Sequence, residues 1–277
     1  MPELPEVETV RSGLEKHVIG KTIVSTRQLH PRALRADSLN TLRIFKDATI
    51  KAVKRRGKFM WFEFNRPEVL VAHLGMSGQF KIQKIGSPSE SHLRANFTLS
   101  NGREMRFIDQ RTFGWLAVDL LDGKIPNLVS HIARDPFDSD FDKRSVVKQI
   151  SSKRGQIKKV ILDQEVISGI GNIYADEALW RARIHPETIA SDLSATQILN
   201  LITAATKIME RALAAGGTSF DELYINVNGE SGYFERSLAV YGREGEPCRR
   251  TPRCGEKIIR IAFANRSSRL CPACQTR

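Results

Sequence analysis

Residues 94–109 read "RANFTLSNGREMRFID", two runs in which apolar and polar side chains alternate around a central Asn101-Gly102 pair. Alternation with a period of two places the apolar side chains on one face of a half-buried strand. Asn-Gly is the pair that two-residue hairpin turns favour, because both of its positions need a positive φ. The stretch therefore predicts two antiparallel strands joined at Asn101-Gly102, with one face turned towards a core.

Strand-like runs continue on both sides of this hairpin and cover residues 22–121. Ahead of them, residues 3–19 repeat apolar side chains every three or four positions, and Gly20 follows as a stop. This is the spacing of a helix with one buried face. The economical arrangement is an antiparallel β-sandwich, or a barrel, on which the first helix packs.

Residues 133–142 form a break rich in proline and aspartate, after which helical spacing replaces alternation. We expect helices at 143–152, 156–164, 172–183 and 194–215, followed by a long stretch without a clear period. We therefore predict an α+β protein. Its expected parts are an N-terminal β-sandwich domain at 1–132, a helical domain at 133–242 and a C-terminal cysteine-containing hairpin at 243–277.

All four cysteines lie in the last part, as Cys248-x5-Cys254 and, after sixteen further residues, Cys271-x2-Cys274. The residues between the pairs alternate like a β-hairpin. Two cysteine pairs that flank a short hairpin are typical of a structural zinc site with four thiolate ligands. The second pair has standard spacing, whereas the first is wider than the usual two to four intervening residues. Free or weakly bound thiols are the alternative.

The chain has 43 basic and 31 acidic residues and a formal net charge of +12. Residues 243–277 are strongly basic, and the run "KAVKRRGK" at 51–58 carries five cations and no acid. Such an excess favours a polyanionic partner, with nucleic acid first. A ribosome- or membrane-surface protein, or merely a basic surface, are the alternatives. No unbroken apolar run approaches a membrane span, and no signal peptide is apparent, so we expect a cytoplasmic protein.

The chain opens with "MPELPEVETV", which places Pro2 and Glu3 at the start of the first helix. One interpretation is an ordinary helix start, since proline and acids suit a first turn. The other is chemical. Removal of Met1 frees a secondary amine whose pKa lies below that of a lysine, and this amine can attack a sugar carbon to form an iminium ion with Glu3 as the nearby acid.

Three further motifs combine glycine with functional side chains. In "SGIGNIYADEALW" (168–180), glycines lead into a helix, a backbone arrangement that can bind a phosphate. "HLGMSG" (73–78) and "DQRTFG" (109–114) place large side chains beside glycine at strand ends. These side chains are either core residues at turns or wedges that fill the gap when a base leaves a duplex.

Together these motifs resemble the formamidopyrimidine-DNA glycosylases, the bacterial enzymes that excise oxidised purines and nick the abasic strand. The similarity runs in order from residue 2 to residue 274, through these segments: "PELPEVE", "RRGK" (55–58), "HLGMSG", "DQRTFG", "SGIGNIYADEALW", "NGESGYF", "VYGREGEPC" and the cysteine hairpin. The resemblance implies a β-sandwich with a leading helix, a helix–two-turns–helix domain and a zinc finger that holds one Zn²⁺.

The resemblance also implies catalytic roles for five residues. Pro2 matches the nucleophile that forms a Schiff base, and Glu3 matches the acid that assists base loss and sugar opening. Glu6 matches a supporting acid. Lys58 matches a lysine credited with phosphate contact and proton transfer in β-elimination, and Arg266 matches the finger arginine that grips phosphate and is credited in δ-elimination. The zinc ligands would be Cys248, Cys254, Cys271 and Cys274.

The DNA contacts implied by the resemblance fall into three groups. Met76, Arg111 and Phe113 match side chains inserted into the duplex, with Arg111 facing the orphaned cytosine. Residues 217–234 match a loop that closes over the everted base. The expected phosphate contacts are His73, His92, Lys153, Lys158 and Asn172.

The implied function is a bifunctional glycosylase and AP lyase of base excision repair that acts as a monomer on damaged duplex DNA, associated with the bacterial nucleoid. Two departures from the family pattern are the extra residues in Cys248-x5-Cys254 and the presence of Gln110 and Thr112 where many members read "DPRRFG". The alternatives are an endonuclease VIII-like enzyme for oxidised pyrimidines and a non-catalytic DNA-binding zinc protein. Leu4 and Phe113 favour the purine enzyme.

Overall fold

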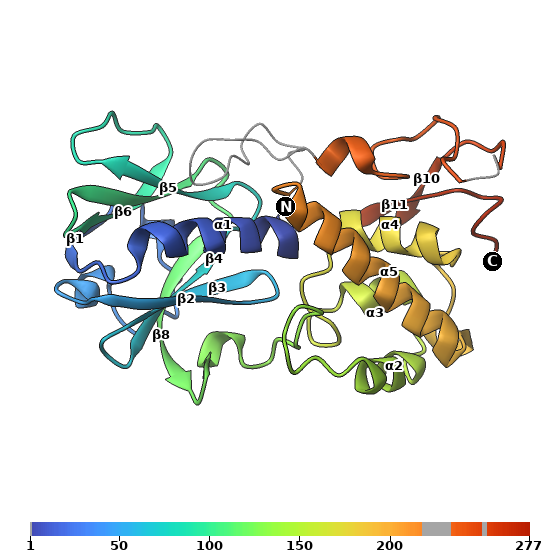
Figure 1. Ribbon diagram of the computed structural model, residues 1–277, viewed down its shortest axis with the longest axis horizontal. Coiled ribbons are helices and arrows are strands. Elements are labelled where there is room, and N and C mark those ends of the chain that lie inside the picture. The colour runs from blue at the N-terminus through green and yellow to red at the C-terminus, as the bar shows by residue number, and fades with distance from the viewer. Residues whose placement is uncertain (1, 218–233, 251–253) are drawn as a thin grey trace. The chain divides into compact units, whose positions relative to one another are not determined.

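The computed structural model describes residues 2–217, 234–250 and 254–277 (Figure 1). The chain divides into two compact units. Unit 1 comprises Met1–His131 with Ala215–Tyr233, and unit 2 comprises Ile132–Ala214 with Phe234–Arg277. Among the described residues, none of the helices combines the length and the apolar character needed to cross a membrane.

Unit 1 contains two antiparallel sheets. One has the order β1-β6-β7-β5 and the other the order β2-β3-β4-β8-β9. The strands are β1 (Ile23–Gln28), β2 (Ile50–Arg56), β3 (Phe59–Phe64), β4 (Glu68–His73), β5 (Gly78–Lys84), β6 (Leu93–Leu99), β7 (Arg103–Asp109), β8 (Trp115–Asp122) and β9 (Ile125–Pro126). The predicted hairpin is β6–β7, in which Phe97 pairs with Met105. Its connection has three residues, 100–102, and of the Asn101-Gly102 pair only Gly102 has a positive φ, of +75°, so the expected two-residue turn is wrong in detail.

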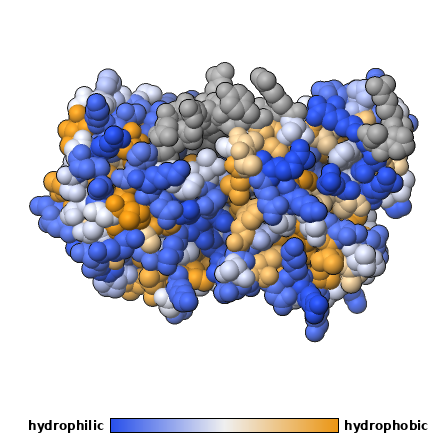
Figure 2. Space-filling model, viewed as in Figure 1, coloured by the Kyte–Doolittle hydropathy of each residue, from blue (hydrophilic) through white to orange (hydrophobic). Residues whose placement is uncertain are grey.

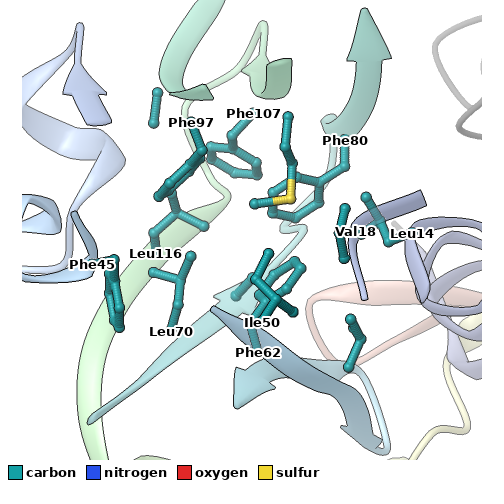
Figure 3. Packing of buried hydrophobic residues seen from close by; sticks show 14 of the residues in the cluster. Leu14, Val18, Phe45, Ile50, Phe62, Leu70, Phe80, Phe97, Phe107 and Leu116 are labelled. Atoms are coloured by element: carbon teal, nitrogen blue, oxygen red, sulfur yellow. The ribbon is translucent and has the colours of Figure 1, made fainter. Parts of the chain in front are cut away.

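The core of unit 1 lies between these sheets and is rich in aromatic side chains (Figure 3). Phe62 of β3 and Phe80 of β5 meet edge to face, with ring centroids 5.7 Å apart, so the two sheets contact each other directly. Helix α1 (Leu4–Val18) adds the fully buried Leu14 and Val18 to the same cluster. The expected sandwich with a leading helix is therefore confirmed, as is the α+β class.

Unit 2 consists of helices and one short hairpin. The helices are α2 (Lys143–Ser151), α3 (Ile157–Leu162), α4 (Asn172–Ala182) and α5 (Ala195–Ala214), and the strands are β10 (Ile259–Phe263) and β11 (Arg266–Leu270). The largest difference from the predicted bounds is at the end of α3. There the Asp163 carboxylate accepts the backbone N–H of Glu165 at 3.0 Å, a local turn that replaces the next helical turn.

Short 3₁₀ turns connect several of these elements, at Pro31–Ala33, Leu42–Phe45, Asn127–Val129, Ala190–Asp192 and Phe234–Ser237. Hydrophilic residues cover much of the visible face (Figure 2), in keeping with the net charge of +12. The loop expected at 217–234 lies outside the described residues apart from its two end residues. The boundaries expected after residues 132 and 242 stay predictions.

Candidate functional site

The N-terminal candidates lie at the first turn of α1. Glu3 caps this helix, and its backbone N–H donates to Glu6 Oε2 at 2.9 Å in a capping box. Pro2, Glu3 and Glu6 are all buried, Glu3 to within 1 % of full burial. Glu6 thus holds the backbone of Glu3 in place. This is a supporting position, since Glu6 acts on the residue next to Pro2.

Lys58 is the second residue of the turn between β2 and β3 and is 6 % exposed. Arg55 ties this turn to the helix, because its side chain donates to Glu8 Oε2 at 2.9 Å and to the Gly57 carbonyl at 3.0 Å. Burial opposes ionisation of Glu8, but hydrogen bonds from Arg11 and Arg55 outweigh it and lower the Glu8 pKa. An ion pair therefore anchors the lysine-bearing turn to α1, the helix that Pro2 and Glu3 precede.

His73 ends β4, with its ring packed against Phe59 and Trp115. Burial, helped by the positive charges of Lys58 and Arg35, lowers the pKa of His73 to about 4. Its Nδ1 accepts the backbone N–H of Gly75 at 3.2 Å, so the proton of the neutral ring resides on Nε2. At neutral pH His73 can therefore donate a hydrogen bond to a phosphate, without forming an ion pair.

Residues 74–77 and 110–114, which we call the paired loops, are joined by the buried carboxylate of Asp109. Oδ1 accepts the hydroxyl of Ser77 at 2.5 Å, and Oδ2 accepts the backbone N–H of Gly114 at 2.7 Å. The Ser77 hydroxyl in turn accepts the backbone N–H of Arg111 at 2.9 Å. Both residues lie in motifs already apparent in the sequence, "HLGMSG" and "DQRTFG". No role could be predicted for Asp109 or Ser77, because only the fold brings them together.

The paired loops present the three side chains expected to enter DNA. Phe113 is 53 % exposed, and the Arg111 guanidinium lies 5.2 Å from the centre of its ring. Met76 is on the facing loop, next to Gly75, where a Cβ atom would lie only 2.3 Å from the Phe113 backbone. This close approach requires glycine. His92 lies nearby, since its carbonyl accepts the backbone N–H of Asp109 at 2.9 Å.

In unit 2, Lys158 of α3 is completely buried, contrary to what a direct phosphate contact requires. Its Nζ lies 2.7 Å from Asp176 Oδ1 of α4 and donates to the Ser267 carbonyl at 2.9 Å. Asn172, at the start of α4, donates to the same carbonyl at 3.2 Å. The ammonium of Lys158 therefore supports the hairpin, and a DNA contact at Asn172 stays a prediction.

The carboxylate of Asp176 is the centre of this attachment. It accepts the hydroxyl of Ser268 at 2.7 Å and the backbone N–H of Arg269 at 3.0 Å, both on β11. The exposed Arg266 begins the same strand, immediately after a two-residue turn, and pairs with Phe263. Asp176 thus holds the strand that presents Arg266. Lys153 is exposed in the turn after α2.

Glu177, the next residue of α4, is a second buried acid that the sequence did not single out. Its carboxylate accepts three successive backbone N–H groups, from Ala239, Val240 and Tyr241, at distances of 2.8 to 3.0 Å. These hydrogen bonds fix the chain just before it enters the cysteine region. The partners are more than 60 residues from Glu177 along the chain, so no local pattern reveals them.

The four cysteines come together as one cluster. Their Sγ atoms all lie within 4.8 Å of one another, and those of Cys254 and Cys271 are 3.4 Å apart. A tetrahedral zinc ion with Zn–S distances of about 2.3 Å requires sulfurs about 3.8 Å apart, which this cluster approximates. The thiols are free rather than joined in disulfides. The cluster can therefore bind one zinc ion, and the wide Cys248–Cys254 spacing is compatible with it.

Comparison with known proteins agrees with this arrangement in every part of the chain. Family models for the Formamidopyrimidine-DNA glycosylase N-terminal domain, the Formamidopyrimidine-DNA glycosylase H2TH domain and the Zinc finger found in FPG and IleRS match residues 1–116, 132–222 and 245–277. The Formamidopyrimidine-DNA glycosylase of Nocardioides sp. is 51 % identical over 99 % of this chain and 94 % of its own, and that of Rhodococcus opacus is 52 % identical over 99 % and 97 %.

Solved structures are similar over the whole chain as well. The complex between the Lactococcus lactis FPG and a DNA containing Fapy-dG superposes with a TM-score of 0.86 at 32 % identity, covering 99 % of this chain and 100 % of that one. MutM in complex with DNA containing carbocyclic 8-oxo-G gives 0.86 at 33 % identity, covering 100 % of both chains. On sequence, domain order and fold alike, this chain belongs to the formamidopyrimidine-DNA glycosylase family.

Proposed function

We propose that this protein excises oxidised purines, namely 8-oxoguanine and formamidopyrimidines, from duplex DNA and then cleaves the abasic strand by β,δ-elimination. The observation that carries this proposal is the buried Pro2 beside Glu3, held by the capping box with Glu6. Binding alone requires cations but not a proline amine next to an oriented acid. We further propose that it works as a monomer associated with the bacterial nucleoid.

In the proposed reaction, the Pro2 nitrogen forms a bond to C1′ of the sugar as the bond from C1′ to the damaged base breaks. The departing base takes up a proton, and the proline nitrogen, which is positively charged after the attack, releases its own proton and regains its lone pair. Glu3 then protonates the ring oxygen, the C1′–O bond breaks, and the nitrogen lone pair closes the iminium ion. This cation acts as an electron sink, so that loss of a C2′ proton expels the 3′ phosphate.

Lys58 and Arg266 are proposed to act on the flanking phosphates. Lys58 contacts phosphate and moves the proton of the β-elimination, and Arg266 neutralises the 5′ phosphate that leaves in the δ-elimination. The exposed position of Arg266, at the tip of an anchored hairpin, supports a phosphate contact. The zinc ion, bound by four thiolates, has no open position for substrate and would serve as a structural element.

Eversion of the damaged base is proposed to depend on the paired loops. Met76, Arg111 and Phe113 would fill the gap that the base leaves, with Arg111 facing the orphaned cytosine. A half-exposed Phe113 with a guanidinium over its ring supports this, because both side chains lie at the surface, where a duplex can reach them. His73, His92, Lys153 and Asn172 would contact the phosphates.

Borohydride trapping tests the proposal. The protein with its native N-terminus is incubated with a duplex containing 8-oxoguanine opposite cytosine, and in parallel with a dihydrouracil duplex. We expect a covalent band with the purine lesion, mapped to Pro2 by mass spectrometry. The band should be much weaker in Pro2→Gly and absent in protein that retains Met1. A band with the dihydrouracil duplex alone would show that the substrates are oxidised pyrimidines. Tight binding to both duplexes without any band would show that the protein binds DNA but does not form the Schiff base.

A further inference from the structure

Trp180, near the C-terminal end of α4, lies against the cysteine cluster. Its indole N–H donates to Cys248 Sγ at 3.3 Å. The ring also packs on the small apolar cluster formed by Val240, Ile258 and the buried cysteines. A side chain of the helical part of unit 2 thus contacts the first cysteine of the wide pair directly.

Arg250 contacts the tryptophan from within the wide cysteine pair. Its guanidinium carbon lies 4.4 Å from the centre of the Trp180 ring, and its Nη2 donates to the Trp180 backbone carbonyl. Arg250 itself lies inside the wide Cys248–Cys254 pair, two residues after Cys248. The stacking and the hydrogen bond therefore connect this loop to the residue whose indole contacts Cys248.

We infer that Trp180 and Arg250 are positioning residues of the zinc site that compensate for the Cys248-x5-Cys254 spacing. A longer loop between two ligands has more conformational freedom to lose when a metal binds. Here Cys248 is oriented from outside the loop, by the indole N–H, and Arg250 locks the indole in place. N–H donors to a metal-bound sulfur orient the ligand and disperse its negative charge, as outer-shell partners do at other metal sites.

The two residues contribute different groups, which separates their effects. Trp180→Phe keeps an aromatic ring on which Arg250 can stack and removes the pyrrole ring with its N–H. Arg250→Lys keeps the positive charge and removes the planar guanidinium that both stacks and donates. Because each variant loosens the same sulfur, the double variant should lose less zinc affinity than the product of the two single losses.

The test is zinc affinity of the full-length protein, measured by competition with a chromogenic chelator. We expect Trp180→Phe and Arg250→Lys each to weaken zinc binding by about tenfold, the lower end of the effects seen for outer-shell partners. Two matched variants should retain the original affinity. They are Trp61→Phe, whose indole donates to Glu63 at 3.1 Å in unit 1, and Arg249→Lys, an exposed neighbour that donates to the Leu238 carbonyl.

Cobalt substitution supplies a second readout that a merely destabilised fold would not change selectively. We expect the thiolate-to-cobalt absorption of both variants to shift while their circular dichroism stays native. A deletion of residues 251–253, which restores Cys-x2-Cys spacing, should reduce the effect of Trp180→Phe. Unchanged zinc affinity in both single variants would overturn the inference. If Trp180→Phe lowered zinc affinity equally in the original chain and in the 251–253 deletion, the two residues would not compensate for the wide cysteine spacing. Arg250→Lys remains informative if Trp180→Phe does not fold.

Discussion

The paired loops of unit 1 and the β10–β11 hairpin of unit 2 both present an exposed arginine, and each is tied down by a buried aspartate. Asp109 holds the paired loops with neutral donors alone, from Ser77 and Gly114. Asp176 holds the hairpin with similar donors, but it also pairs with a buried lysine. The lysine lies on a different helix, so the hairpin is attached to two helices, whereas each of the paired loops connects one sheet of unit 1 to the other.

This difference sets the cost of breaking each attachment. A buried carboxylate with a buried cation becomes far less stable when the cation is removed, because an uncompensated charge stays in the interior. A carboxylate that relies on neutral donors loses hydrogen bonds but no counter-charge. The hairpin should therefore be the more sensitive of the two regions to a single substitution.

The largest effect is expected for Lys158→Met. The change leaves Asp176 buried without its cation and should lower the free energy of unfolding by about 3–5 kcal/mol, measured by urea denaturation. Lys159→Met is the control, since Lys159 is the exposed neighbour on the same helix and should change stability little. Equal stability of the two variants would show that the buried pair contributes nothing to the attachment.

A smaller effect is expected for Asp109→Asn. The amide has one acceptor fewer, so the Ser77 hydroxyl or the Gly114 N–H loses its partner, at a cost of about 1–3 kcal/mol in unfolding free energy. The loops that carry Arg111 should lose order, and binding to a duplex with an abasic site should weaken. Asp122→Asn, at an exposed position, serves as the control. Full DNA affinity in Asp109→Asn would show that the Asp109 carboxylate is not needed to keep the paired loops ordered for DNA binding.

The neutral state of His73 predicts a pH effect in unit 1. Its folded-state pKa of about 4 lies below the ordinary value of 6.5, so between these values the unfolded chain binds a proton that the folded chain does not. Stability must therefore fall as the pH falls through this window. His73→Asn, which keeps an acceptor for Gly75, should reduce the loss of unfolding free energy between about pH 7 and about pH 5. His131→Asn, at an exposed histidine, should leave that loss unchanged.

The smallest effect concerns Thr112, which departs from the common family pattern and has a φ of +53°. A β-branched side chain is strained in this left-handed region, whereas glycine is not. Thr112→Gly should therefore raise the free energy of unfolding by up to about 1 kcal/mol. Thr112→Ser keeps the Cβ atom and the hydroxyl that donates to the Arg111 carbonyl at 2.8 Å, and should change little. A loss of stability in Thr112→Gly would show that the threonine is not strained.

Local patterns allowed most of the architecture to be predicted. The β6–β7 hairpin and the helices follow from periodicity within a few residues, and the cysteine cluster follows from spacing. The attachments were not predictable, because Asp176 and Ser268 are 92 residues apart and only the fold joins them. The same limit applies to Lys158. From the sequence, this lysine is interpreted as a phosphate ligand because it lies near a glycine-rich turn. The fold shows instead that its charge is paired with the buried Asp176 of the next helix.

Helix α4 carries four separate attachments within eleven residues. Asn172 and Asp176 hold the hairpin, Glu177 holds the chain at 239–241, and Trp180 reaches the first cysteine. The cysteine cluster and the hairpin turn that carries Arg266 are thus both held in position by α4, rather than by each other. A loop whose flanking residues are fixed by such a helix can change in length without displacing its functional side chains. The segment between Cys248 and Cys254 is therefore a suitable site for engineered insertions.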